Sequence, residues 1–464
     1  MAVETGTYDS PEAIQASLDR ILNIFHDLGV TNVYVKRLAP NDNSKNQPYF
    51  GAHLTDLAFI PTGNTEASES VSRKPGKRRI KYQTSVDLSW VDANGQTYLA
   101  PNSKLIYYPQ YPEVRFSGFL QGSNVDVGGW MDPSRSGRSE GRWLLLGVAP
   151  KNKIYAYLAT PQSALANELA NTEFAEISKV FGEIVRENLA IRSTRSELLA
   201  KLLSIHLKGW IPGQKMTKDG ANEPYMAVNG GGYTLEAELG VAPNGIAQPD
   251  FLGWEVKQFG VSEFPAKGTS PTTLMTPEPN GGFYLDHTAA EFIRKYGYPA
   301  RSGQVGRLNF GGVHRANKPC NATGLTMILS GYDPDSSTIV DASGALLLVD
   351  GEGNVAASWS FAKLIDHWKT KHAQAVYVPA LRRRSDKGGF EYLFGQNIEL
   401  GVGTDFRRFL SAMNCGDVFY DPGIKMENAD SGKPEIKKRN QFRVKHKDLS
   451  SLYKMYEYLD LTED

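Results

Sequence analysis

The stretch at residues 248–258 constrains the fold most, because it places three charged side chains at fixed spacing in a segment that favours a strand. Its aromatic and β-branched residues are typical of β-structure. Side chains two positions apart in a strand point to the same face, so Glu255 and Lys257 are expected to point together. Asp250 stands where the chain enters the strand and can approach this pair from its end. The sequence therefore predicts two carboxylates and one ammonium group gathered at the start of one strand.

This arrangement of charges suits a divalent metal ion. Mg²⁺ binds through one or two carboxylates, keeps several waters and takes phosphate oxygens from a substrate. We therefore predict Asp250 and Glu255 as Mg²⁺ ligands and, with Lys257, as the catalytic residues of a nuclease. Lys257 would orient or deprotonate the attacking water, or neutralise charge in the transition state. The alternative is an exposed strand with an ordinary surface ion pair, because so short a pattern often occurs by chance.

Length and charge place the chain among multidomain globular proteins. Its 464 residues imply two or three domains. Basic and acidic residues balance at 51 each, so net charge gives no sign of nucleic-acid binding. Local clusters of positive charge suit a phosphate backbone, although such runs are often only solvated surface. The clusters are Arg73, Lys74, Lys77, Arg78, Arg79 and Lys81; Arg382, Arg383 and Arg384; and Lys433, Lys437, Lys438, Arg439, Arg443, Lys445 and Lys447.

The two cysteines, Cys320 and Cys415, form neither a disulfide framework nor a zinc-ligand spacing. The N-terminus lacks the basic-then-apolar pattern of a signal peptide, and no apolar run reaches membrane-spanning length. We therefore expect a cytoplasmic protein with no membrane partner.

The remaining pattern divides the chain into three parts. A helix is predicted over residues 10–29, and short strand-like runs between Gly, Pro, Asn and Ser clusters indicate a β-barrel or pseudobarrel up to about residue 158. Apolar residues at helical spacing predict a helix over 164–188, and a further helix begins near Ser193 or Thr194. An α/β pattern follows to the end of the chain. The predicted domains are 1–160 for DNA binding, 161–192 as a helical connector and 193–464 for catalysis.

Several polar residues of the first domain have the chemistry to bind DNA. Arg115 beside Glu113 can read a G·C pair, since arginine donates to guanine and glutamate accepts from cytosine. Basic and amide side chains that pair with base edges or phosphates lie further upstream; they are Lys36, Arg37, Asn41, Asn43 and Gln47. For Asn41, Asp42 and Asn43 the alternative is a role in turns.

Two blocks of this domain resemble the N-terminal effector domain of the restriction endonuclease EcoRII. The first spans residues 34–43 and continues through Gln47 to 59–63, and the second runs from 106–122 to 141–147. The resemblance implies a DNA-binding pseudobarrel of the plant transcription factor type, in which two loop arms straddle the major groove. Residues 44–48 depart from the Gly-rich, histidine-containing stretch of the EcoRII arm.

The segment around the charged stretch resembles the MvaI and BcnI restriction endonucleases, members of the PD-(D/E)XK nuclease superfamily. The Asp-x4-Glu-x-Lys spacing is reproduced, and Glu236 lies as far before Asp250 as a family glutamate carried on a helix. The residues themselves allow either Glu236 or Glu238 to deliver this further carboxylate, and the resemblance favours Glu236 as a catalytic residue.

Matches continue through 358–361, 375–378, 416–418 and 442–444. They place Asp421 and Arg443 where the family contacts bases, and their side chains suit a cytosine amino group and guanine. Two positions depart from MvaI: Gly423 replaces a base-reading arginine, and 437–439 replace a histidine-containing loop.

Together the two resemblances imply a monomeric, Mg²⁺-dependent endonuclease that cuts double-stranded DNA at CCWGG, where W is A or T. The first domain would bind a second copy of the site. The alternatives are a DNA-binding regulator that does not cut and a repair nuclease that acts on mismatched DNA.

Overall fold

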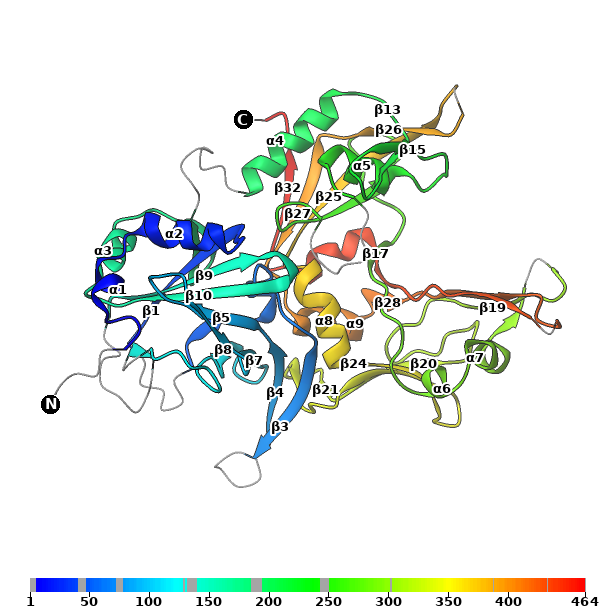
Figure 1. The fold of residues 1–464 in the computed structure, drawn as a ribbon. Helices are drawn as coiled ribbons and strands as arrows, with labels where there is room; N and C mark the ends of the chain where they lie inside the picture. Colours follow the sequence, from blue (N-terminus) through cyan, green and yellow to red (C-terminus); the bar gives the residue numbers. More distant parts are fainter. Residues whose placement is uncertain are drawn as a thin grey trace. The chain divides into compact units, whose positions relative to one another are not determined.

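The computed structural model describes residues 6–40, 47–71, 78–127, 130–131, 140–184, 194–242, 250–300, 303–386, 388–431 and 433–463. The chain forms two compact units, Met1–Ser193 and Thr194–Asp464 (Figure 1). Each unit has its own sheets and its own core.

The first unit is built around a seven-stranded sheet in which only β10 and β5 run parallel. A serine begins each of its helices, and the helices α1 (Pro11–Gln15), α2 (Leu18–Asp27) and α3 (Ala164–Ala170) pack together. The strand order is β11 (Ala175–Ser178), β12 (Phe181–Ile184), β1 (Asn32–Leu38), β9 (Arg142–Ala149), β10 (Lys153–Ala159), β5 (Asp87–Val91) and β6 (Thr97–Ala100).

A second sheet of five strands shares an aromatic core with the first. The Phe50 ring stacks on Phe116 at 4.8 Å and meets the edge of Phe181, a β12 residue, at 5.0 Å. In both sheets the described strands pair in an open order that does not close into a barrel. The order is β2 (Tyr49–Gly51), β8 (Glu113–Ser117), β7 (Lys104–Tyr108), β4 (Arg78–Ser85) and β3 (Thr65–Val71). The 3-10 turn η1 (Leu54–Leu57) follows β2 in the chain, and η3 (Pro150–Asn152) lies between β9 and β10 of the first sheet.

The helix predicted over 164–188 is wrong beyond Ala170. An antiparallel pair of strands, β11 and β12, follows and extends the seven-stranded sheet through β1. The apolar residues here recur at spacings that fit a helix, but they pack on sheet partners: Phe174 contacts Trp143 of β9. The helix predicted over 10–29 is also divided, because Ser17 caps a new helix and Ala16 takes an extended conformation.

The second unit has a central sheet that carries the predicted catalytic strand. β16 (Glu255–Gly260) pairs in parallel with β25 (Gln374–Arg384). The helices α4 (Thr194–Leu207) and α5 (Gly231–Leu239) contribute Leu198, Leu202 and Leu235 to the core on this sheet. The strand order is β13 (Ile211–Pro212), β26 (Phe390–Phe394), β25, β27 (Asn397–Val402) and β32 (Met455–Asp460).

Smaller sheets and helices complete this unit (Figure 1). Three of these sheets contain β17 (Thr272–Met275), β31 (Phe442–Val444) and β28 (Val418–Tyr420); β18 (Tyr298–Pro299), β19 (Leu308–Gly311), β29 (Gly423–Glu427) and β30 (Glu435–Lys437); and β20 (Thr326–Ser330), β23 (Ala345–Val349) and β24 (Val355–Ser360). Two strand pairs are β14 (Gln214–Met216) with β15 (Asn222–Pro224) and β21 (Tyr332–Asp333) with β22 (Thr338–Ile339). The helices are α6 (Phe283–Asp286), α7 (Ala289–Tyr296), α8 (Phe361–Lys371), α9 (Phe406–Cys415) and the 3-10 helix η4 (His446–Leu452). Among the described residues, the helices fall short of the length and apolarity that a membrane crossing requires.

Candidate active site

A tight turn immediately before β16 positions Asp250. Phe251 and Trp254 exchange two backbone hydrogen bonds of 3.0 and 2.8 Å across Leu252 and Gly253. Both central residues have positive φ, 48° and 83°, as a type I′ turn requires. The turn folds the chain back, so that the Asp250 carboxylate accepts a hydrogen bond of 2.9 Å from the Val256 amide at the start of β16. The predicted approach of Asp250 to the strand from its end is therefore achieved by a hairpin.

Glu255 and Lys257 point to the same face of β16 and form an ion pair. The Glu255 side chain is 1% exposed, whereas Lys257 keeps 26% of its side-chain surface. Burial by itself lowers the pKa of Lys257, but the carboxylates of Glu255, Asp250 and Glu236 outweigh it and hold that pKa above its ordinary value. The ammonium group is therefore protonated at neutral pH.

The helix α5 brings Glu236, and not Glu238, to this site. Two residues on a helix are rotated by about 200° from each other, so these carboxylates leave opposite faces. Glu238 accepts hydrogen bonds from Gln214 and Lys208, away from β16. Glu236 lines the same cleft as Glu255 and contributes to the field at Lys257.

These groups lie in a cleft of about 1210 Å³ in the second unit. Its lining combines the acidic centre with positive side chains from distant parts of the sequence, as a site for a phosphate backbone requires. The cations are Lys257, Lys267, Arg382, Arg439 and Arg443. Lys267 escaped the sequence analysis because no neighbouring cation marks it, and Arg382 and Arg439 were predicted only as members of basic runs.

The donor set fits Mg²⁺. Glu255 Oε2 is buried and has no hydrogen-bond partner among the described residues, while Oε1 binds Lys257. A buried carboxylate oxygen without a partner is costly unless a cation or a water binds it. In the described part of the chain no three His, Cys, Asp or Glu side chains form a metal-binding cluster, and the two carboxylates near Lys257 at the start of β16 are Asp250 and Glu255. Such a site suits an ion that retains water and takes phosphate oxygens.

The two predicted base-reading residues bind each other. Arg443 Nη1 donates to Asp421 Oδ2 at 2.7 Å, and its Nη2 donates to the Pro271 carbonyl at 2.7 Å. In the antiparallel pairing of β31 with β28, Arg443 lies opposite Phe419, which is two residues before Asp421. Arg443 lines the same cleft as Glu255 and Lys257 of β16.

Arg439 occupies the space beside Gly423. A backbone hydrogen bond of 2.8 Å joins Gly423 N–H to the Arg439 carbonyl, and a Cβ on Gly423 would stand 3.6 Å from the Arg439 Cδ atom. Arg439 of the facing segment therefore lies directly beside Gly423.

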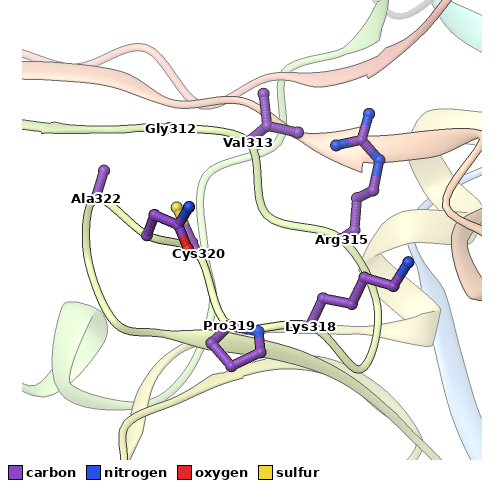
Figure 2. Close-up of a pocket in the computed structure, with 8 residues that line it drawn as sticks. Gly312, Val313, Arg315, Lys318, Pro319, Cys320 and Ala322 are labelled. Carbon is purple, nitrogen blue, oxygen red and sulfur yellow. The ribbon is translucent and has the colours of Figure 1, made fainter.

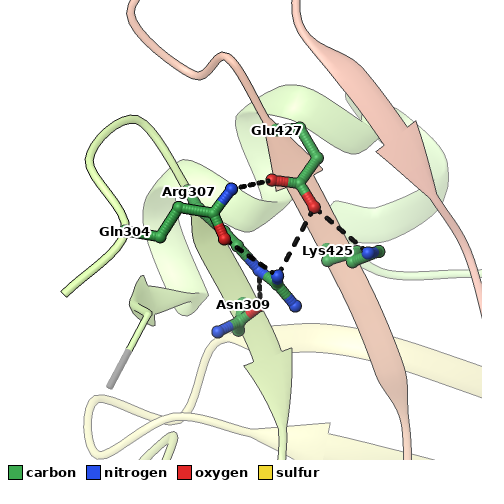
Figure 3. Close-up of polar contacts among 5 residues, drawn as sticks. All are labelled: Gln304, Arg307, Asn309, Lys425 and Glu427. Carbon is green, nitrogen blue, oxygen red and sulfur yellow. Dashed lines mark hydrogen bonds and ion pairs between the residues drawn. The ribbon is translucent and has the colours of Figure 1, made fainter. Parts of the chain in front are cut away.

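A polar network on the outer strands supports this region. Glu427 of β29 binds Lys425 at 3.1 Å, Arg307 at 3.6 Å and Gln304 at 3.2 Å, while Arg307 also donates to Asn309 (Figure 3). The hydrogen bond from Lys425, together with the nearby cations, lowers the pKa of Glu427. The network joins β19 to β29, the strand that follows Asp421.

A separate pocket of about 350 Å³ in this unit is lined by Cys320 with Arg315 and Lys318 (Figure 2). Burial raises the pKa of the Cys320 thiol, but hydrogen bonds from His314, the Ala322 amide and Thr323 prevail and lower it to about 6. A thiol with this pKa is largely thiolate at neutral pH.

In the first unit the structure brings together Gln47, Glu113 and Arg115. Arg115 donates to Glu113 Oε2 through Nε and Nη2 at 3.1 and 2.7 Å, and Nη1 donates to the Gln47 carbonyl at 3.2 Å. The Gln47 amide donates to Ser117 at 2.8 Å. All three predicted residues thus meet at β2 and β8.

The other predicted DNA-binding residues are distributed differently. Lys36 and Arg37 point to opposite faces of β1; Lys36 is 8% exposed and Arg37 faces solvent. Asn41 and Asn43 lie outside the described residues, as do Arg73, Lys74 and Lys77 of the first basic run.

Comparison with known proteins assigns the second unit to a class of enzymes. The model of the MvaI/BcnI restriction endonuclease family matches residues 199–453, more than half of the chain. The match makes the chain a DNA-binding hydrolase of the restriction endonuclease type. It belongs to the MvaI/BcnI restriction endonuclease family.

Similar solved structures include MvaI with its cognate DNA substrate, at 17% identity and a TM-score of 0.43, and MvaI without DNA, at 16% and 0.32. Each covers 58% of this chain and 99% of MvaI. A search of curated proteins gave no match.

Proposed function

We propose that this protein is a Mg²⁺-dependent endonuclease that cuts double-stranded DNA at CCWGG as a monomer, with the first unit binding a second copy of the site. One observation carries the cleavage proposal. Asp250, Glu255 and Lys257 meet at the start of one strand, and Glu255 and Lys257 line a cleft together with Arg443 and Arg439. The family match supplies the class of reaction.

Asp250 and Glu255 would hold the metal ion. Glu255 Oε2, which has no hydrogen-bond partner among the described residues, would be one of the ligand atoms. Bound Mg²⁺ lowers the pKa of a coordinated water and offsets negative charge on the phosphate. Lys257 forms an ion pair with Glu255 and would hold a phosphate oxygen and stabilise the charge that develops during attack. Glu236 adds to the negative field that keeps Lys257 protonated. Hydrolysis would leave a 5′-phosphate and a 3′-hydroxyl.

Base reading in the catalytic unit would rest on Arg443 and Asp421, which fix each other before DNA binds. An arginine that is held in place loses less freedom when it donates to guanine O6 and N7. Arg439, beside Gly423, would supply the second arginine contact. Asp421 would accept from a cytosine amino group.

In the first unit, Arg115, Glu113 and Gln47 would form the base-reading arm of an EcoRII-like effector domain. The ion pair of Arg115 and Glu113 matches the donor and acceptor pattern of a G·C pair. Binding a second site there would tether or stimulate the catalytic unit.

The test is a time course with supercoiled plasmids that carry two, one or no CCWGG sites, with Mg²⁺ and with EDTA. We expect cutting only at CCWGG and only with Mg²⁺, a nicked intermediate because one active site cuts the strands in turn, and faster cutting of the two-site plasmid. Binding without cutting would indicate the regulator instead. Cutting confined to mismatched duplexes would indicate the repair nuclease.

A further inference from the structure

A pocket of about 410 Å³ in the first unit lies between strands that the cleavage reaction does not use. β1, β9, β11 and β12 form it, and Lys36, Trp143, Phe174, Ser178, Lys179 and Phe181 are among its lining residues. All these strands belong to the seven-stranded sheet. The pocket is therefore a property of the first unit alone.

Lys36 is the unusual member of this lining. Its side chain is buried, with 8% of the residue exposed, yet it makes no hydrogen bond or ion pair with the residues that the structure describes. Its ammonium nitrogen lies 5.8 Å from the centre of the Phe181 ring. Burial lowers the pKa of Lys36 to about 8. A buried cation without a counter-charge is costly, and an anion in the pocket would remove that cost.

A second polar group in the same lining has no partner. Ser178 Oγ is buried without a hydrogen bond to any described residue. It stands at an irregularity of β11, between Glu176 and Ser178, where the pairing with β12 shifts. One lining thus contains an ammonium group and a hydroxyl that have no hydrogen-bond partner among the described residues, which suits a ligand with several acceptor oxygens.

The rest of the lining defines the ligand further. Arg37 and Lys179 add two positive charges, and Glu176 adds one negative charge. The rings of Trp143 and Phe174, both half-buried, lie 5.7 Å apart at one wall. Aromatic faces stack on nucleobases, and positive side chains hold the phosphate.

We infer that this pocket binds a single nucleotide unit, with its phosphate toward Lys36 and its base against Trp143 and Phe174. The unit comes either from a free nucleotide or from an unpaired position of a DNA strand. This inference deepens the proposed DNA-binding role of the first unit, and it rests on that role only for the source of the nucleotide.

The test is calorimetric titration of the full chain in EDTA, which prevents cutting, with thymidine 5′-monophosphate at pH 8. Lys36, with a pKa of about 8, is half neutral there and takes up a proton when an anion binds. The heat should therefore depend on the ionisation enthalpy of the buffer. Thymidine and inorganic phosphate, each with half of the chemistry, should bind at least about tenfold more weakly.

Lys36→Met and Lys179→Met remove the same charge from the same pocket and form a matched pair. We expect Lys36→Met to weaken binding at least about tenfold and to abolish proton uptake, and Lys179→Met to weaken it less than about threefold. Equal effects of the two substitutions would mean that only the net charge of the pocket matters, and would overturn the inference. Tight binding of inorganic phosphate would overturn it as well. Lys36→Met removes a buried lysine that has no ion-pair partner among the described residues, so the melting temperature of this variant should not fall. Trp143→Leu, a second variant, should weaken binding of the nucleotide but not of inorganic phosphate.

A single-stranded oligonucleotide identifies the source. Tighter binding than the monophosphate, lost in Lys36→Met, indicates a DNA strand; equal binding indicates a free nucleotide. Binding of CCWGG duplex by the wild type, measured separately, tests the proposed function, and its failure would leave the nucleotide result standing.

Discussion

One oxygen of the Glu255 carboxylate binds the Lys257 ammonium group, and the other, Oε2, is buried with no hydrogen-bond partner in the described part of the chain. The two oxygens thus differ in role: one fixes the lysine and the other remains available to a cation. A conservative change at each residue can separate these roles.

Lys257→Met should slow cutting strongly and leave DNA binding in EDTA within about threefold, because the change removes a charge needed in the transition state. The loss of a single stabilising group of this kind costs about 10²–10³-fold in rate. Single-turnover cleavage of a CCWGG duplex measures it. Lys267→Met is the control, since Lys267 lines the same cleft but its ammonium group lies over the Tyr458 ring. Equal losses in the two variants would contradict a specific role for Lys257.

Glu255→Gln should abolish the stabilisation of the protein by Mg²⁺. A ligand that binds the folded state at about 100 times its Kd adds about 2.7 kcal/mol to the free energy of unfolding. We expect Mg²⁺ to raise the melting temperature of the wild type but not of Glu255→Gln. The control is Glu238→Gln, because Glu238 binds Lys208 and Gln214 instead of facing the site. A Mg²⁺ shift that survives in Glu255→Gln would place the metal elsewhere.

The catalytic strand was predictable because its information is local. Strand propensity and a two-residue alternation place Glu255 and Lys257 on one face of β16. The hairpin that returns Asp250 was not predicted, since it depends on positive φ at Leu252, a residue that rarely adopts it. Arg382 and Arg439 reach the cleft only through long-range strand packing, which no local pattern records.

The helix predicted over 164–188 illustrates the opposite error. Its apolar spacing satisfies a helical period, but β12 finds a better partner in β1, where Val35 pairs with Gly182. Tertiary pairing overrides local propensity there. By contrast, the strand-like runs expected before residue 158 include β1, which the structure confirms as a strand with five of its seven residues buried.

The rate at which the buried Cys320 reacts with iodoacetamide should follow its low pKa, in contrast to the exposed Cys415. The folded thiol has a pKa of about 6, below its ordinary value, so the rate falls as the pH drops through 6 and is level above about pH 7. An ordinary thiol continues to gain reactivity up to about pH 8.5. Mass spectrometry of the two cysteine peptides measures both rates in one sample. A rate for Cys320 that still rises between pH 7 and 8.5 would contradict the hydrogen-bonded thiolate.

Arg443→Lys should relax base discrimination while preserving most of the affinity for DNA. Lysine keeps the positive charge but lacks the planar fork that donates to two acceptors on guanine, so about 1–3 kcal/mol of discrimination at one base pair is lost. Competition between CCWGG duplexes and duplexes with one altered base pair measures it. Arg439→Lys should relax a different base pair if Arg439 supplies the second contact, and Lys437→Arg serves as the control for positive charge on β30. Uniform weakening on every sequence would show that these arginines bind phosphates only.

Arg115→Ala should remove the advantage of a second CCWGG site and leave one-site cleavage unchanged. Arg115 binds Glu113 and the Gln47 carbonyl, so its loss removes the G·C-reading donor and frees the Gln47 segment. The ratio of cleavage rates on two-site and one-site plasmids should fall to about one, with no fall in the melting temperature beyond the few degrees that loss of one half-buried ion pair causes. Lys153→Ala is the matched control, since Lys153 also forms a partly exposed ion pair in this unit, with Asp87 at 2.7 Å. A two-site advantage that persists in Arg115→Ala but is lost in Lys153→Ala would place the effector contact on another part of the first unit.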